Sequence, residues 1–142
     1  MNQIKSHTDL EAWQVGMEMV TGMYKVTARF PGEERYGLTA QIRRAAVSVP
    51  SNVAAGQGRG AGRGTIHFLR IALGSLAEVD TQLEIAIRLG FVPASVCEDV
   101  RELMVSTGKL VSGLRRAKLR RLGLSVSAAL AISALPLWRL LS

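Results

Sequence analysis

Apolar residues recur three or four positions apart in four stretches of this chain, and this period limits its fold more than any other feature. The spacing places the apolar side chains of each stretch along one face of an α-helix. Helix-breaking residues separate the stretches: Phe-Pro-Gly at residues 30–32, five glycines within residues 56–64, and Gly90 followed by Pro93. No stretch shows the strict alternation of a half-buried strand, so the sequence predicts an all-α fold.

Four helices are predicted, at about residues 9–29, 38–55, 65–89 and 95–121. Helices joined by short connections pack as antiparallel neighbours. The expected fold is therefore an up-down antiparallel four-helix bundle formed by residues 1–121, followed by an apolar C-terminal tail at residues 122–142. Pro50 lies inside the second helix, where it removes a backbone donor, so a kink is predicted there.

Local patterns predict where these helices begin and end. Thr8 and Glu11 have the spacing of a capping box for the first helix, and Ser95 and Glu98 have the same spacing for the fourth. Gly90 is expected to be the glycine that terminates the third helix.

Composition agrees with a helical bundle. Of the 142 residues 48% are apolar but only 5% are aromatic, so the core must consist of aliphatic residues and methionine. A chain of this length forms one ordinary domain. Cys97 is the only cysteine, which excludes an internal disulfide and indicates a reducing compartment. Residues 1–8 are polar and do not resemble a signal peptide, so a cytoplasmic location is expected.

The net charge of +7 is divided unevenly along the chain. Residues 1–114 hold 12 Lys and Arg against 11 Asp and Glu, whereas residues 115–142 hold six basic residues and no acidic one. The 17 residues at 122–138 carry no charge, which is at the short limit for a transmembrane helix. Three serines and Pro136 weaken that interpretation. The tail is expected to pack on a partner, to fray, or to contact a membrane.

No set of residues forms a recognisable catalytic or metal site. The two histidines, His7 and His67, are far apart and have no paired carboxylate at ligand spacing. The connector at residues 56–64 has neither GxGxxG nor P-loop spacing, so it is a flexible loop or a generic anion site. Cys97 is expected to be structural, although the start of a helix could lower its pKa. The sequence predicts no enzyme activity, no metal and no cofactor.

Nine basic residues form the candidate nucleic-acid site. Arg43 and Arg44 are expected to point outward from the second helix, where they serve subunit salt bridges or RNA phosphates, with counter-charges available at residues 32–35. Arg59 and Arg63 lie in the glycine-rich connector. The other five are at the end of the fourth helix: Arg115, Arg116, Lys118, Arg120 and Arg121. Exposed aromatic residues are scarce, so binding is expected to be electrostatic and to weaken steeply with salt.

Two long strings carry a family resemblance. Residues 30–59 read FPGEERYGLTAQIRRAAVSVPSNVAAGQGR and residues 68–91 read FLRIALGSLAEVDTQLEIAIRLGF. With DLEAWQVGMEMV at residues 9–20, they resemble the four-helix-bundle family named for reading frames inside intervening sequences of bacterial 23S rRNA genes. The resemblance covers about residues 8–114 and implies a small cytosolic bundle that assembles into a ring-like homo-oligomer, with a pentamer as the expected form.

The resemblance also implies partners. Related bundles serve as accessory proteins of reverse transcriptases in diversity-generating retroelements, so RNA or a reverse transcriptase is a partner implied by fold-level analogy. Two features depart from the family. Ala55 stands where the family pattern N-I-A-E-G has a glutamate, and the tail after residue 121 extends past the usual end of the family.

Two functions are therefore predicted. The first is a non-enzymatic oligomeric accessory factor associated with RNA or a ribonucleoprotein. The alternative is a structural, self-assembling protein tethered to a membrane or a partner through its basic and apolar tail. Self-association is expected because the first helix has apolar residues outside its predicted buried stripe of Leu10, Trp13, Met17, Val20, Tyr24 and Ala28. The residues outside the stripe are Val15, Met19, Met23 and Val26, joined on the third helix by Leu69, Leu73 and Ile87.

Overall fold

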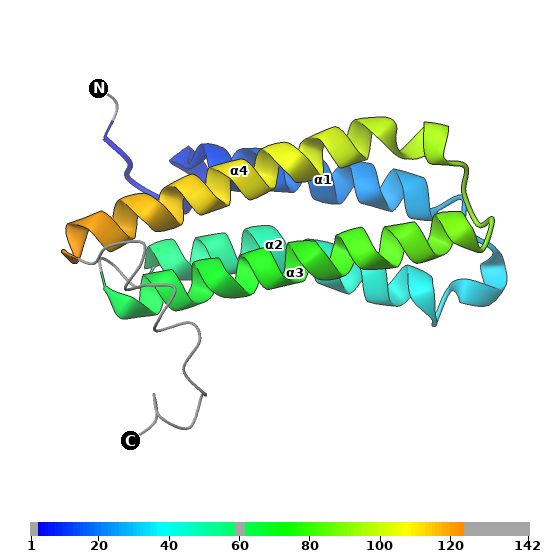
Figure 1. The fold of residues 1–142 in the computed structure, drawn as a ribbon, viewed down its shortest axis with the longest axis horizontal. Coiled ribbons are helices and arrows are strands. Elements are labelled where there is room, and N and C mark those ends of the chain that lie inside the picture. The colour runs from blue at the N-terminus through cyan, green and yellow to red at the C-terminus, as the bar shows by residue number, and fades with distance from the viewer. Residues whose placement is uncertain (1–2, 59–61, 124–142) are drawn as a thin grey trace, which may run out of the picture.

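The computed structural model describes residues 3–58 and 62–123, and every regular element among them is helical. The four main helices are α1 (Glu11–Thr27), α2 (Leu38–Gly58), α3 (Arg63–Arg88) and α4 (Glu98–Arg121). Successive helices run antiparallel, and each packs mainly against two others (Figure 1). The predicted up-down four-helix bundle is confirmed. None of the helices in this part of the chain combines the length and apolarity needed to cross a membrane.

The helix ends differ from the predicted ends by up to three residues, and both predicted capping boxes are wrong. Residues His7–Asp9 form a separate 3₁₀ turn before α1, in which Ser6 Oγ accepts from Thr8 N and Asp9 Oδ2 accepts from Ser6 N. The capping box therefore lies two residues earlier than expected. Before α4, residues Ala94–Cys97 form another 3₁₀ turn, and no side chain caps α4.

The end of α3 is as predicted. Gly90 has φ +75°, a conformation that glycine adopts without steric cost. Phe91 N donates to Ala86 O at 2.9 Å and Gly90 N donates to Ile87 O at 3.0 Å. These two bonds are those of a Schellman motif, which satisfies the last carbonyls of the helix.

The second helix continues through Pro50 to Gly58, three residues past its predicted end. Pro50 is buried and faces α1 at Gly16, where an added Cβ would lie 3.5 Å from Pro50 Cβ. The Glu34 side chain caps the start of this helix, because its Oε2 accepts a 2.9 Å hydrogen bond from Leu38 N. Residues Gly32–Glu34 form the third 3₁₀ turn.

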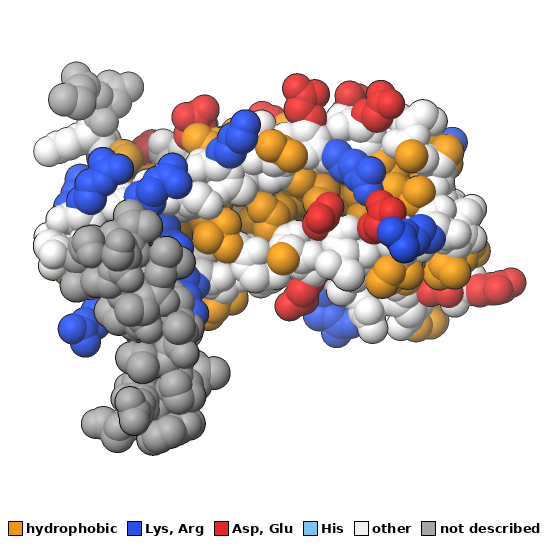
Figure 2. All heavy atoms as spheres, in the orientation of Figure 1, with side chains coloured by type: hydrophobic (Ala, Val, Ile, Leu, Met, Phe, Trp, Pro, Cys, Tyr) orange, Lys and Arg blue, Asp and Glu red, His pale blue; other side chains and the backbone are white. Residues whose placement is uncertain are grey.

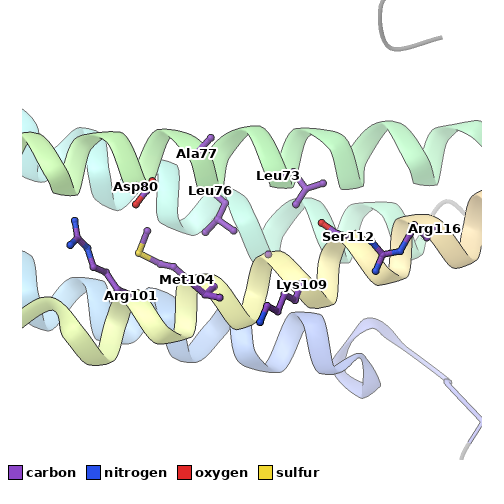
Figure 3. A pocket seen from close by; sticks show the side chains of 11 residues that line it. Leu73, Leu76, Ala77, Asp80, Arg101, Met104, Lys109, Ser112 and Arg116 are labelled. Atoms are coloured by element: carbon purple, nitrogen blue, oxygen red, sulfur yellow. The ribbon is translucent and has the colours of Figure 1, made fainter. Parts of the chain in front are cut away.

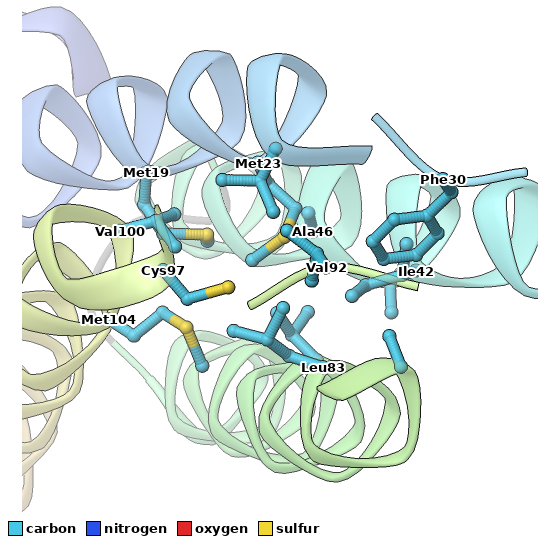
Figure 4. Close-up of a cluster of buried hydrophobic side chains, with 14 of the residues drawn as sticks. Met19, Met23, Phe30, Ile42, Ala46, Leu83, Val92, Cys97, Val100 and Met104 are labelled. Carbon is cyan, nitrogen blue, oxygen red and sulfur yellow. The ribbon is translucent and has the colours of Figure 1, made fainter. Parts of the chain in front are cut away.

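The core consists of two clusters of buried aliphatic side chains. The larger one draws on all four helices, and Figure 4 shows Met19 and Met23 of α1 meeting Ile42 of α2, Leu83 of α3 and Met104 of α4. The smaller cluster lies toward the start of α3 and includes Leu10, Val53, Leu69 and Val111.

The predicted buried stripe of α1 is wrong in part: Leu10 is buried as predicted, and Trp13 and Val20 pack against the core, but other members are exposed. Met17 is 39% exposed and Tyr24 is 42% exposed, whereas Met19 and Met23 are fully buried. Apolar residues cover more than one face of this helix, so the 3.6-residue period cannot select the face that packs. Because Met19, Met23, Val26 and Leu69 are core residues, they cannot form the association surface that the sequence suggested.

Candidate nucleic-acid interface

All four helices reach one end of the bundle (Figure 1): α2 and α4 finish there, and α1 and α3 begin there. A buried contact holds α2 against α3, since Thr65 Oγ1 donates to Gly56 O at 3.0 Å. Gly56 allows this close approach, because an added Cβ would lie 3.3 Å from Thr65 O. The contact fixes the first turn of α3 beside the last turn of α2.

Six of the nine predicted residues come together here. We call this surface the basic end and define it by Arg63 of α3 and five residues of α4, namely Arg115, Arg116, Lys118, Arg120 and Arg121. Figure 2 shows Lys and Arg side chains gathered at this end. Arg59 lies outside the described residues.

The basic end has few acidic neighbours, for a reason visible in the sequence. No Asp or Glu occurs between Glu34 and Glu78, and none follows Glu102. The antiparallel fold brings the late part of α2, the early part of α3 and the late part of α4 to the same end. Asp9, in the 3₁₀ turn before α1, and Glu11, the first residue of α1, are the acids at this end. Of the acid-free stretches, the one at residues 115–142 entered the prediction from sequence, but the one between Glu34 and Glu78 was overlooked.

The cations of the basic end are available to a ligand. Arg63, Arg116, Arg120 and Arg121 are exposed, and Lys118 is half-buried. Within residues 3–58 and 62–123, both ion pairs use Glu84, which belongs to the other half of the bundle, so no ion pair neutralises these six residues. Arg115 is half-buried, with its Nε buried and without a hydrogen-bond partner.

A concave site lies within the basic end. Its volume is about 430 Å³, and its lining includes the apolar side chains of Ile4, Leu10 and Leu114 together with Lys118 and Arg121. This combination offers cations for phosphate and an apolar surface for a base.

Two aromatic pairs flank the same end. His7 lies edge-on to Trp13 with 5.3 Å between ring centroids, and His67 lies edge-on to Phe68 at 5.8 Å. Trp13 and Phe68 are half-buried rather than enclosed in the core, so part of each ring faces solvent.

Arg43 and Arg44 lie apart from this group. They are 14 or more residues before the end of α2, a distance of about 21 Å along the helix. Arg43 Nε donates to Thr27 Oγ1 at 2.8 Å and Arg43 Nη2 donates to Tyr24 O at 3.2 Å. Its guanidinium carbon also sits 4.4 Å from the centroid of the Tyr24 ring.

Arg44 is exposed, and the expected counter-charges do not reach either arginine. Glu34 instead accepts from the backbone at the start of α2, and no ion pair joins residues 32–35 to Arg43 or Arg44 in the part of the chain that the structure describes.

The remaining candidates form no chemical site. Cys97 is fully buried, and burial raises the pKa of its thiol despite the opposing charges of Arg101 and Arg29. The predicted structural thiol is consistent with this environment, and the start of α4 does not activate it. No cluster of three or more metal-ligating side chains occurs within the described ranges.

Comparison with known proteins identifies a family. The family model described as 23S rRNA-intervening sequence protein matches residues 8–113. No curated protein matches the chain. The matched region includes the first three helices and most of α4, and it stops just before Arg115. Five of the six residues of the basic end therefore lie beyond the matched region.

Proposed function

The chain belongs to the 23S rRNA-intervening sequence protein family, and we propose that it is a non-enzymatic accessory protein that binds RNA phosphates through the basic end. One observation carries this proposal: six basic side chains lie together on the acid-free ends of α3 and α4, with no ion pair among the described residues to neutralise them. A phosphate backbone gains affinity from such a surface because each neutralised phosphate releases a counterion.

The surface favours a flexible, single-stranded ligand. Exposed arginines present planar donors that suit phosphate oxygens, and the concave site beside Lys118 and Arg121 has room for an unstacked base. The part-exposed rings of Trp13 and Phe68 add stacking surfaces at the edge. Because the charges far outnumber the stacking rings, binding depends on salt more than on base sequence.

Self-association completes the proposal. Ile71 and Ile85 are exposed on one face of α3, 14 residues apart, and Met17 and Tyr24 are exposed on one face of α1. Exposed apolar side chains such as these are the positions at which another copy of the chain would pack. The family resemblance gives a ring as the form, with a pentamer expected. In a homo-oligomer several basic ends bind one RNA, so weak contacts combine into useful affinity. RNA, or a reverse transcriptase that carries RNA, is the proposed partner.

RNA binding is tested with the full chain and a labelled single-stranded RNA, in a salt titration. The test variant replaces Arg116, Arg120 and Arg121 by alanine. The control variant replaces Lys25, Arg29 and Arg35, which are exposed on the other end of α1 and the connection to α2, so both variants lose three charges. The test variant is expected to lower the slope of log affinity against log salt by about two, since each phosphate contact on a single strand contributes about 0.7. The control is expected to keep the slope.

Three outcomes would contradict the proposal in different ways. Absence of RNA binding by the wild-type chain at low salt removes RNA as the ligand. An equal decrease of the salt slope in the test and control variants would show that RNA binding depends on net charge and not on the basic end. Binding to anionic phospholipid vesicles without binding to RNA favours the structural, membrane-tethered alternative. Light scattering tests self-association separately, and a stable monomer at micromolar concentration would contradict it.

A further inference from the structure

An open groove runs between α3 and α4. Its volume is about 770 Å³, and apolar side chains form much of its lining, among them Leu73, Leu76, Met104 and Val105. Figure 3 shows Leu73 and Leu76 pointing from α3 toward α4, and Met104 pointing back from α4. The apolar lining is visible along the middle of the face in Figure 2. Of the four neighbouring helix pairs, α3 and α4 pack least extensively.

Small residues form part of the lining of this groove, namely Ala77, Gly108 and Ser112. At Gly108 the two helices approach closely, since an added Cβ would lie only 3.2 Å from Leu76 Cδ2. An apolar surface of this kind in water favours a covering segment.

One segment of the chain begins beside the groove. Residues 124–142, LSVSAALAISALPLWRLLS, lie outside the described residues and outside the family match. They follow Gly123, whose φ of +72° and N–H bond to Arg120 O end α4 and change the direction of the chain. The groove residues of α4 run from Arg101 to Arg116, so one end of the groove lies near Gly123.

The length of the segment matches the groove. Arg101 and Arg116 are 15 residues apart, so the groove extends for about 22 Å along α4. Nineteen residues span about 28 Å as a helix and more when extended, so residues 124–142 can cover the whole groove by running back antiparallel to α4.

The composition of residues 124–142 can also be compared with the lining of the groove. The segment is apolar and contains no acid, and its only charge is Arg139. If the segment were helical, Arg139 would lie about 24 Å from Gly123, whereas Asp80 lies about 25 Å from the start of α3 at the same end of the bundle. Asp80 lines the groove and makes no ion pair within the described ranges. Asp80 is therefore the one favourable charge partner for Arg139 in the groove, because the other charged residues of the lining, Arg101, Lys109 and Arg116, are cations.

We propose that residues 124–142 fold back from Gly123 and pack in the α3–α4 groove of the same chain. The apolar side chains of the segment and those of the groove, whose lining also holds four charged residues, both leave water when one covers the other. The covalent link supplies a high effective concentration, which favours the segment over a separate partner. Arg116 lines the groove and also belongs to the basic end, so the tests below measure the packing of Trp138 and not RNA binding.

Trp138 reports on the packing directly. The chain has two tryptophans, so Trp13→Phe leaves Trp138 as the only emitter. In this background Trp138 is expected to have blue-shifted emission and a Stern–Volmer constant for acrylamide at least two-fold below that of the urea-unfolded chain. Val105→Glu places a charge in the groove at a side chain that is 57% exposed, so folding is retained while the constant rises toward the unfolded value. Val47→Glu is the control, at a side chain that is 41% exposed on α2 and does not line the groove, and is expected to leave the constant unchanged.

A charge exchange tests the orientation of the segment. Asp80→Lys is expected to raise acrylamide quenching of Trp138, and adding Arg139→Glu to that variant is expected to restore protection. Protection that disappears on hundredfold dilution would show packing on another copy and overturn the proposal. Quenching of Trp138 that equals the unfolded value in every variant would overturn it as well. So would protection that requires anionic phospholipid vesicles, which would assign the segment to a membrane surface.

Discussion

Arg43 Nε donates a 2.8 Å hydrogen bond to Thr27 Oγ1, and this contact joins the last turn of α1 to the second turn of α2. The Thr27 hydroxyl is buried and uses its own proton in a 2.8 Å bond to Met23 O. Arg43 therefore holds α2 against α1, in addition to being one of the residues predicted from the sequence to bind phosphate. Charge-assisted hydrogen bonds of this type contribute more to stability than neutral ones.

Removing the Thr27 hydroxyl tests how much this hydrogen bond contributes to stability. Thr27→Val keeps the shape of the buried side chain but deprives Arg43 Nε of its acceptor, and is expected to lower the free energy of unfolding by about 1–2 kcal/mol. Thr21→Val is the matched control, because the Thr21 hydroxyl bonds Glu18 O at an exposed position. Urea denaturation at equal m-values measures both. Equal stability of the two variants would show that the Arg43 bond contributes nothing.

The neighbouring arginines should behave differently. Arg43→Ala is expected to cost about 1–2 kcal/mol of unfolding free energy, because it also removes the contact with the Tyr24 ring. Arg44→Ala changes an exposed side chain and is expected to stay within about 0.5 kcal/mol of the wild type. Thermal and urea unfolding measure the difference. A destabilised Arg44→Ala variant would contradict the assignment.

Two glycine substitutions are expected to have opposite signs. Gly90→Ala forces a side chain into the left-handed region at φ +75° and should destabilise the bundle by about 1 kcal/mol. Gly74→Ala lies inside α3 with open space around the new Cβ, and should stabilise by up to about 1 kcal/mol through helix propensity. Melting temperatures distinguish the two, and a shift of the same sign would contradict the backbone argument.

The Glu84 cluster makes stability depend on pH. Hydrogen bonds from Arg101 at 2.7 Å and Arg88 at 3.1 Å lower the pKa of Glu84. A carboxyl whose pKa is lower in the folded state stabilises that state above its unfolded pKa, near 4.3, and loses this contribution as the pH falls through the folded pKa.

Glu84→Gln is therefore expected to be less stable than the wild type at pH 7, and the difference should shrink toward pH 3. Added salt should reduce the difference at pH 7, because the pair is exposed and screened. Denaturation curves across this range provide the measurement. A difference that is constant with pH would exclude the ionised pair as its cause.

The Cys97 thiol is expected to resist modification. Burial raises its pKa and blocks access, so a disulfide reagent at pH 7 should react only as fast as the bundle opens. Ser95→Cys adds an exposed thiol in the same turn, and this variant should label one thiol at once and the second slowly. Urea should accelerate the slow reaction. Immediate labelling of the wild-type chain would contradict the buried position.

Local sequence patterns determined the number and approximate bounds of the helices. Apolar spacing and helix-breaking residues act over one or two turns, so they can be read without knowledge of the neighbours. Gly90 is the clearest case, because a left-handed residue after a helix favours glycine in any fold. The capping boxes failed because the same residue types recur within a few positions, and Ser6 with Asp9 competed successfully with Thr8 and Glu11.

Tertiary structure decided which residues each helix buries and which cations meet. Met17 and Met19 are two residues apart on a helix with apolar side chains on more than one face, and only packing against α2 and α4 selects Met19 for the core. The antiparallel fold likewise gathers Arg63 with Arg116 and leaves Arg43 toward the other end, bound to Thr27. These outcomes depend on contacts between residues distant in sequence, and such contacts leave no local period for a sequence pattern to reveal.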